Sequence, residues 1–354
     1  MRALAALLVL WAATPALAAA GDYPPVRPGV ALQFPRDAGS HPLFRNEWWY
    51  ITGWLKAQDG SELGMQITFF RNRPGIDENS ASRFAPRELL FAHAALSDPK
   101  AGRLLHDQRA ARGGFGLARA KEGRTEVAIE DWSLKADGAA YDAEVVARDF
   151  RYRLRFVATQ GVLPEGERGV SRKGPLPAQA SYYYSEPHLT VIGTVRVGGG
   201  EERTVMGEAW LDHEWSSEPL PEGAVGWDWI GINLEGGGAL MAFRMRDKDG
   251  GSFWAGGSLR GADGRVRVLK PSEVRFTPLR RWRSPRTGAE YPVAVRVEAG
   301  PIALELAPLM DDQEMDARAS TGTVYWEGAV RATGEKSAGR GYLELTGYWK
   351  PLKL

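Results

Sequence analysis

The sequence predicts an all-β protein that consists of two antiparallel β domains. Many short runs alternate apolar and polar side chains, which is the period-two pattern of strands. Turn-forming residues separate these runs, and the 354-residue chain contains 42 glycines and 22 prolines. No segment keeps the periodicity of a long helix. The two domains are expected to be barrels or sandwiches packed side by side, and barrels are favoured because many predicted strands carry bulky residues on both faces.

The first 18 residues are expected to be a secretory signal peptide. One positive charge, an apolar run and an Ala-x-Ala ending precede an expected cleavage near Ala18–Ala20. The proline-rich residues 19–45 are then expected to form an extended leader on the surface. Later apolar runs are too short to cross a bilayer, so no stable membrane insertion is predicted. The expected location is periplasmic or secreted.

The N-terminal β domain is predicted to span residues 46–217. Its first two strands, 47–55 and 63–70, flank an Asp-Gly turn and are predicted to form a hairpin. Residues 106–122 are expected to hold a helical turn. A slip in the alternation between Ala147 and Phe150 predicts a bulge or turn. Further strands are predicted at 89–96, 127–134, 143–158, 189–197 and 204–210.

The C-terminal β domain is predicted to span residues 218–354. A glycine-rich turn at 235–238 joins the strands 229–234 and 239–246 in another hairpin. The remaining predicted strands are 253–260, 266–269, 274–278, 291–297, 302–308, 323–333 and 341–349.

Composition and motifs exclude several classes of function. The net charge of +1 does not indicate a basic surface of the kind that binds nucleic acid. The absence of cysteine removes disulfides, thiolate metal sites and cysteine nucleophiles. The sequence has neither the Gly-x-Ser-x-Gly motif of serine hydrolases nor a phosphate-binding Gly-x-x-x-x-Gly-Lys loop. Five histidines lie far apart in the sequence, so neither a metal site nor a cofactor is predicted.

Candidate acid–base chemistry is concentrated between residues 205 and 234. His213 is flanked by Asp212 and Glu214, and Asp228 follows in the next predicted strand. Neighbouring side chains alternate faces on a strand, so Asp212 and Glu214 should share one face and His213 the other. His213 then needs a carboxylate from another strand, such as Asp228 or Glu47. The alternative is a buried structural histidine.

Aromatic residues in the same region and around the first hairpin are candidates for the walls of an apolar pocket. The alternative is ordinary barrel core, because tryptophan and tyrosine fill volume in any β protein. The candidate ligand-binding residues of this kind are Trp48, Trp49, Tyr50, Tyr182, Tyr184, Trp215, Trp227 and Trp229.

Several motifs resemble the AttH family of secreted proteins, often described as predicted hydrolases, which is similar to the carotenoid 1,2-hydratases (CrtC-like). The resemblance covers about residues 40 to 350 and implies two packed lipocalin-like domains. The motifs are Asn46–Tyr50, Ala92–Asp98, Tyr182–Ser185, Gly207–Trp215, Gly226–Trp229, Ser284–Gly288, Leu306–Leu309, Tyr325–Ala329 and Gly339–Tyr348.

The hydratase branch implies an acid that protonates a carbon–carbon double bond, and aromatic faces that shelter the cation. His213 and Trp215 match the His-x-Trp motif of that branch. Its proton-donating aspartate lies two residues after a tyrosine on a later strand. Here Phe243 takes the place of the tyrosine, and no acid follows before Asp247. The resemblance adds His93 and Phe243 to the candidate ligand-binding residues.

Two functions follow from these observations, and a structural or assembly role with filled barrels is the remaining alternative. The first is an exported carrier for a hydrophobic or amphiphilic, lipid- or isoprenoid-like ligand. The resemblance links such a carrier to the lipid or lipoprotein pathway of an ABC transporter. The second is a hydratase-like or hydrolase-like enzyme that uses His213 with Asp212, Glu214 or Asp228.

Overall fold

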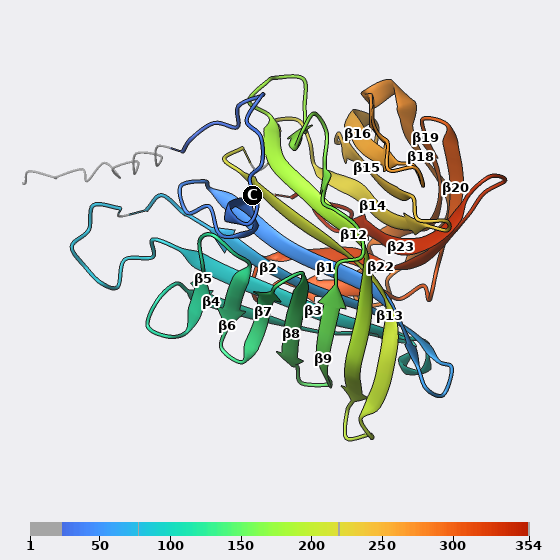
Figure 1. Cartoon of the computed structure of the whole chain (residues 1–354), viewed down its shortest axis with the longest axis horizontal. Helices are drawn as coiled ribbons and strands as arrows, with labels where there is room; N and C mark the ends of the chain where they lie inside the picture. Colours follow the sequence, from blue (N-terminus) through green and yellow to red (C-terminus); the bar gives the residue numbers. More distant parts are fainter. Residues whose placement is uncertain (1–22, 77, 219, 353–354) are drawn as a thin grey trace, which may run out of the picture.

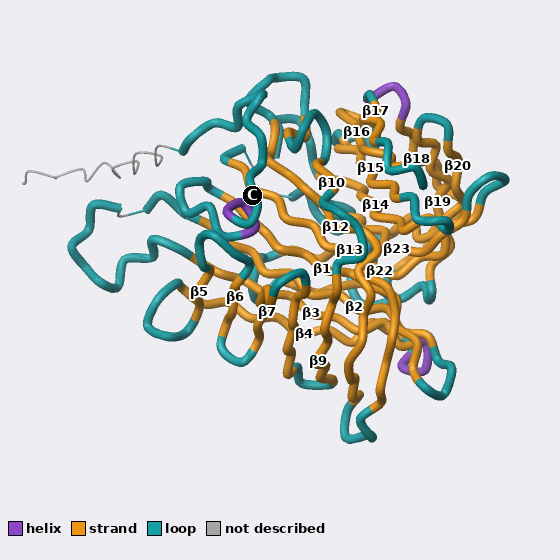
Figure 2. Tube along the Cα trace, in the orientation of Figure 1, coloured by secondary structure: helices purple, strands orange, loops and turns teal. Residues whose placement is uncertain are grey.

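The computed structural model describes residues 23–352 except 77 and 219, and it confirms the all-β prediction. The predicted signal peptide lies outside the described residues. Two antiparallel sheets account for the strands, as Figures 1 and 2 show. The described helical segments are three short 3-10 turns, η1 (Arg36–Ala38), η2 (Pro99–Ala101) and η3 (Pro271–Glu273). Among the described residues, no helix is long and apolar enough to cross a membrane.

The first sheet has thirteen strands and forms a nearly closed barrel. Its main path runs in the order β4-β3-β2-β1-β13-β12-β9-β8-β7-β6-β5, and β10 and β11 pair with β12. The strands are β1 (Asn46–Ala57), β2 (Glu62–Asn72), β3 (Leu89–Asp98), β4 (Arg103–Arg112), β5 (Ala118–Ala120), β6 (Glu126–Ile129), β7 (Trp132–Asp137), β8 (Ala140–Val146), β9 (Phe150–Val157), β10 (Leu163–Pro164), β11 (Val170–Arg172), β12 (Ala180–Val197) and β13 (Arg203–Ser216).

The second sheet has ten strands in the order β17-β16-β15-β14-β23-β22-β20-β19-β18, and β21 pairs with β22. In Figure 1 it is the yellow-to-red sheet. The strands are β14 (Gly226–Leu234), β15 (Ala239–Arg246), β16 (Ser252–Arg260), β17 (Val266–Leu269), β18 (Val274–Arg283), β19 (Glu290–Ala299), β20 (Ile302–Pro308), β21 (Glu314–Ala317), β22 (Thr323–Thr333) and β23 (Ala338–Leu345).

The structure corrects one local prediction and confirms another. The helical turn expected in residues 106–122 is wrong, because β4 and β5 occupy much of this segment. Hydrogen bonding to β3 outweighs the weak apolar pattern that suggested a turn of helix. The slip between Ala147 and Phe150 is confirmed as the turn that separates β8 from β9.

Each sheet encloses its own apolar core, and a third apolar cluster joins the two sheets. The joining cluster includes Trp54 and Trp210 from the first sheet and Trp229 and Tyr342 from the second. The sheets approach so closely there that a Cβ on Gly64 would lie 2.6 Å from the hydroxyl oxygen of Tyr342. The strands β1, β2, β3, β12 and β13 therefore bury one face in their own barrel and turn the other toward the C-terminal sheet.

Residues 23–45 pack against the N-terminal barrel as well as crossing its surface. Asp37 and Ser40 are buried, and the amide of Arg27 donates a hydrogen bond to the hydroxyl of Tyr182. This segment brings His41 beside β1 and β13.

Candidate active site between the two sheets

A cavity of about 350 Å³ lies between the two sheets and is lined by both. This volume is in the range of small-molecule binding sites. The pairing of β13, β1 and β2 forms a row of side chains on the N-terminal wall of the cavity. In this row Asp212 is opposite Tyr50, and Tyr50 is opposite Thr68. A second row places Glu214 opposite Trp48.

The C-terminal wall is a row of side chains across four strands. Phe243 of β15 is opposite Trp229 of β14, and Trp229 is opposite Glu344 of β23. Glu344 is in turn opposite Glu327 of β22. The cavity lining is therefore rich in aromatic side chains, and carboxyl groups from β13, β22 and β23 lie among the rings.

Asp212 is buried, and both of its carboxyl oxygens are hydrogen-bonded. The hydroxyls of Tyr183 and Ser185 and the indole N–H of Trp210 each donate to it at 2.6 Å. Burial raises the pKa of Asp212 to about 7, against the opposing effect of these three donors. The group is poised between its two protonation states near neutral pH.

Glu327, which is buried, and Glu344, which is partly buried, lie opposite each other on the adjacent strands β22 and β23. Burial raises the pKa of Glu344 to about 7, and its Oε2 accepts a hydrogen bond from the indole of Trp227 at 3.0 Å. Burial and the charge of Glu344 together raise the pKa of Glu327 well above its usual value. Two like charges in this position repel, so the pair holds at least one proton at neutral pH.

Glu327 and Tyr50 are buried side by side in the cavity lining. Burial raises the pKa of both groups, and the Tyr50 hydroxyl, as a donor to Glu327, opposes the rise in the pKa of that carboxyl.

Glu165 lies behind Asp212. The hydroxyl of Ser185 is 2.9 Å from Glu165 Oε1 and 2.6 Å from Asp212 Oδ1. Burial raises the pKa of Glu165 to about 8, so this carboxyl is protonated at neutral pH. Because Ser185 has one hydroxyl proton, protonated Glu165 donates to Ser185, and Ser185 donates to Asp212.

Lys173 is the cation of the cavity lining nearest to these acids. Its Nζ is 2.9 Å from Glu214 Oε1 and lies over the rings of Tyr183 and Phe243, 4.9 and 4.4 Å from their centroids. Glu214 is thus held as an ion pair, unlike Asp212, Glu327 and Glu344.

His93 closes one side of the cavity and ties the two sheets together. Its Nδ1 is 2.8 Å from the Tyr325 hydroxyl, and its Nε2 is 2.9 Å from Ser320 Oγ. Ser320 donates its proton to Gln108 Oε1 at 2.7 Å, so His93 Nε2–H donates to Ser320 and Tyr325 donates to Nδ1. Burial lowers the pKa of His93 to about 3. His93 is therefore neutral, and Ser320 is not activated as a nucleophile.

The sequence-predicted site residues fall in three places. Eight of them line the interdomain cavity: Trp48, Tyr50, His93, Asp212, Glu214, Trp227, Trp229 and Phe243. Another group faces the core of the N-terminal barrel: Trp49, Tyr182, Tyr184, His213 and Trp215. Asp228 is buried on the opposite face of β14 from Trp227 and Trp229, and it accepts hydrogen bonds from Arg244 and Arg246.

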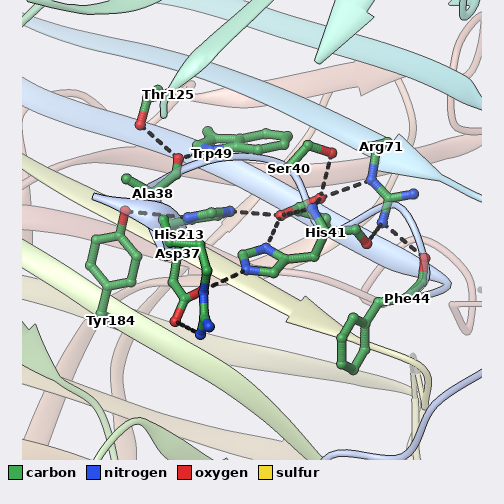
Figure 3. Close-up of polar contacts among 12 residues, drawn as sticks. Asp37, Ala38, Ser40, His41, Phe44, Trp49, Arg71, Thr125, Tyr184 and His213 are labelled. Carbon is green, nitrogen blue, oxygen red and sulfur yellow. Dashed lines mark hydrogen bonds and ion pairs between the residues drawn. The ribbon is translucent and has the colours of Figure 1, made fainter. Parts of the chain in front are cut away.

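His213 belongs to a buried network inside the N-terminal barrel, shown in Figure 3. Its Nε2 is 2.9 Å from Glu47 Oε1 and its Nδ1 is 3.3 Å from the Tyr184 hydroxyl. Glu47 is also 2.7 Å from His41 Nδ1 and 2.8 Å from Arg71 Nε. Of the two carboxylates considered from sequence, Glu47 is the partner, and Asp228 is not.

This network sets the protonation of its members. Burial raises the pKa of Glu47, but hydrogen bonds from the two imidazoles and the charge of Arg71 outweigh it and hold the pKa well below its usual range. Burial is the largest effect on His213 and lowers its pKa. His213 is therefore mainly neutral, enclosed by Trp49 and Trp215, and absent from the lining of the interdomain cavity.

His41, Glu47 and His213 are the one described group whose ligand atoms could hold a metal ion, since these atoms lie within 4.8 Å of one another. The two imidazoles converge on the same oxygen of Glu47, and Arg71 and Ser40 contact the other. A metal ion would have to displace these hydrogen bonds beside a buried guanidinium. The donor set fits a hydrogen-bonded ion cluster better than a metal centre.

Sequence reasoning missed Glu327, Glu344, Glu165 and Lys173, and it placed Tyr182 and Tyr184 rather than Tyr183 among the binding residues. Strand alternation offers a signal for some of them. Glu327 is the neighbour of the buried Trp326 on β22, so the two side chains point to opposite faces of the sheet. Tyr183 likewise points away from Tyr182 and Tyr184, which face the barrel. The pairing of β22 with β23, which joins Glu327 to Glu344, has no such signal.

Comparison with known proteins places the chain in a family. A family model described as AttH-like matches residues 25–348. The crystal structure of an AttH-assigned protein from Nitrosomonas europaea has a TM-score of 0.86 and 52% sequence identity, covering 92% of this chain and 99% of that chain. No curated protein matches the chain.

Two more distant structures share the fold. Kievitone hydratase from Nectria haematococca has a TM-score of 0.70 at 13% identity, covering 93% of this chain and 97% of that one. CghA with Sch210972 has a TM-score of 0.52 at 15% identity, covering 89% and 97%. At these identities the likeness establishes a common fold only. The matches confirm the predicted lipocalin-like architecture, and since the family model covers nearly all described residues, the protein belongs to the AttH-like family.

Proposed function

We propose that the protein is an enzyme that adds water across a carbon–carbon double bond of an apolar substrate held in the interdomain cavity. One observation carries the proposal: Asp212, Glu327 and Glu344 face an aromatic cavity with raised pKa values. Burying acids costs stability, and a passive apolar pocket has no use for them. Perturbed carboxyl groups in a cleft are typical of general acid catalysis.

Glu344 is the proton donor in this proposal, because only one of its oxygens is occupied, by the indole of Trp227. Its proton passes to one alkene carbon, where the π electrons form the new C–H bond, and the other carbon becomes a cation. The faces of Trp227 and Trp229 and the ionised form of Asp212 stabilise that cation. Water bonds to it through oxygen, and the proton that water releases returns to the carboxylate pair. The net reaction consumes substrate and water only.

The position of Glu344 supports its proposed role as the acid. The family resemblance expects an acid two residues after position 243, where this chain has Met245. Met245 and Phe243 both line the cavity on β15. Glu344 lies on β23, opposite Trp229 and in the same row as Phe243, so it supplies an acid to the same space from another strand.

We expect Glu344→Gln to reduce kcat by at least about 100-fold, the usual lower range for loss of a general acid. The assay incubates the protein with apolar alkenes, including isoprenoids, in H₂¹⁸O and detects the labelled alcohol by mass spectrometry. The rate with the unmodified protein should fall as pH rises through about 7, where Glu344 loses its proton. Glutamine keeps the acceptor for Trp227, so substrate affinity should change little.

Glu186→Gln is the matched control. Glu186 is also a buried glutamate whose pKa burial raises, but it is bonded to Tyr141, and it is not among the cavity-lining residues. Its replacement should leave turnover within about twofold of the unmodified protein. Full turnover by the Glu344→Gln variant would refute the assignment of the donor.

A carrier function is the second candidate, supported by the apolar volume of the cavity. Lipid extraction of the purified protein distinguishes the two. A tightly held, unmodified lipid that binds equally well to Glu344→Gln, with no labelled product from any alkene, would favour the carrier. Export to the periplasm or medium and service to an ABC transporter are parts of this second proposal.

A further inference from the structure

A second cavity, of about 430 Å³, lies in the C-terminal domain, away from the proposed active site. It is bounded by β15 and β16 on one side and by η3 and the start of β18 on the other. β15 and β16 are neighbours in the sheet, but β18 lies at its far edge, so the cavity lies where the sheet bends toward its own edge. Its polar lining residues are Arg244, Ser252, Ser272 and Arg275, and no acidic residue is among those described as lining it.

Arg244 is the more buried of the two arginines that line this cavity. It alternates with Phe243 and Met245 on β15, so it points to the opposite side from the interdomain cavity. Its side chain is 13% exposed, and its Nε is 2.6 Å from Asp228 Oδ2. Nη1 makes a long contact of 3.3 Å with the carbonyl of Phe276. Burial lowers the pKa of Arg244, but the charge of Asp228 and the contacts with Asp228 and Tyr348 outweigh this effect and raise the pKa.

The carboxylate of Asp228 is shared by two guanidinium groups. Arg246 Nε is 2.9 Å from Asp228 Oδ1, and the Tyr348 hydroxyl donates to the same oxygen at 3.0 Å. The described cluster thus contains two positive charges and one negative charge, all largely buried.

Two acidic residues lie just outside the cavity, and both contact residues other than Arg244. Glu273 accepts from Arg267 and from the backbone amide of Lys270. Glu298 lies on the exposed surface, 3.8 Å from Arg275. Because two guanidinium groups share one carboxylate, an anion entering beside Arg244 would balance the remaining positive charge.

We propose that this cavity binds the carboxylate of an amphiphilic organic anion. The carboxylate accepts from the guanidinium of Arg244 and from the hydroxyls of Ser252 and Ser272, and arginine is well suited to carboxylate recognition. The apolar part of the ligand packs against Phe253, Val274 and Phe276. The volume suits a chain of about ten carbons.

Isothermal titration calorimetry with decanoate, below its micelle concentration, tests this site. Decanol, with the same chain and no charge, should bind at least about tenfold more weakly, and Arg244→Met should weaken decanoate binding about 10- to 100-fold. Arg296→Met, which removes an exposed arginine on β19 paired with Glu305, is the matched control and should leave the affinity unchanged. Circular dichroism checks that each variant is folded.

Arg244→Lys covers the case in which Arg244→Met does not fold. Lysine keeps a cation beside Asp228 but lacks the second donor edge, so decanoate should still bind more weakly than to the unmodified protein. Equal binding of decanoate and decanol, or an undiminished affinity in the folded Arg244 variants, would overturn the proposal. So would decanoate binding that Trp227→Leu abolishes and the Arg244 variants do not, because the ligand would then lie in the interdomain cavity.

Discussion

Replacing Glu344 with glutamine is expected to stabilise the folded protein by about 3 kcal/mol at pH 9 and to leave its stability at pH 4 nearly unchanged. The reason is the raised pKa of Glu344, about 7 in the folded protein against a model value of 4.5. A pKa raised by folding contributes stability below the unfolded value, and this contribution is lost as pH rises through the folded value. Glutamine cannot ionise, so it avoids that loss.

Urea unfolding followed by tryptophan fluorescence at pH 4, 7 and 9 measures this difference. The unmodified protein should also be less stable at pH 9 than at pH 5, because Asp212 ionises over the same range. Glu201→Gln replaces an exposed acid and should change stability by less than about 0.5 kcal/mol at each pH. A loss of stability in Glu344→Gln at pH 9 would show that the ionised carboxylate is well solvated, and the proposed acid would then lack its basis.

Together with the proposed loss of turnover, this result would identify Glu344 as a residue kept for function at a cost in stability. A variant that is both more stable and inactive is hard to explain by damage to the fold. The same reasoning extends to Glu327, which faces Glu344 across the strands.

Local sequence patterns predicted the fold class because strands and turns depend on residues close together in the sequence. Apolar–polar alternation indicated the strands, and glycine and proline indicated the turns. They also separated Asp212 and Glu214 from His213, since neighbours on a strand must point to opposite faces. They could not decide which sheet face would meet the other domain. Asp212 became a cavity residue through the packing of two sheets, and Glu344 joined it from a strand more than 100 positions away.

The tyrosine run illustrates the same limit. Tyr182, Tyr183 and Tyr184 are the same residue type, so composition cannot rank them. The pairing of β12 with β13 puts Tyr183 opposite Glu214, and its hydroxyl then reaches Asp212. Likewise, Glu47 and Asp228 were equal candidates as the partner of His213. The pairing of β1 with β13 decides for Glu47, because it puts Glu47 and His213 two positions apart on adjacent strands.

Replacing Arg71 with methionine is expected to destabilise the protein by about 3–5 kcal/mol at pH 8. Arg71 and Glu47 are 1% and 0% exposed in their side chains, and their Nε and Oε2 atoms are 2.8 Å apart. Arg71 Nη2 also donates to the carbonyls of His41 and Phe44, each at 2.8 Å. Methionine fills much of the volume but leaves a buried carboxylate and two carbonyls without their partner.

Equilibrium unfolding of three further variants separates this cause from general damage to the core. Arg153→Met breaks an exposed pair with Glu144, whose side chains are 74% and 43% exposed, and should cost less than about 1 kcal/mol. Adding Glu47→Gln to Arg71→Met should recover part of the loss, because it removes the uncompensated charge. Glu47→Gln alone should be destabilising, since it leaves the guanidinium buried without a carboxylate.

The pH dependence of the Arg71→Met deficit gives the sharpest test of the network. His41 and His213 both contact Glu47, and although burial opposes it, hydrogen bonds to Asp37 and Glu47 raise the pKa of His41. As pH falls toward 6, an imidazolium can replace the missing guanidinium beside Glu47, so the deficit should be smaller at pH 6 than at pH 8. A deficit that stays constant over this range, or that grows at pH 6, would contradict the network, because it would mean that the two histidines do not share the charge of Glu47.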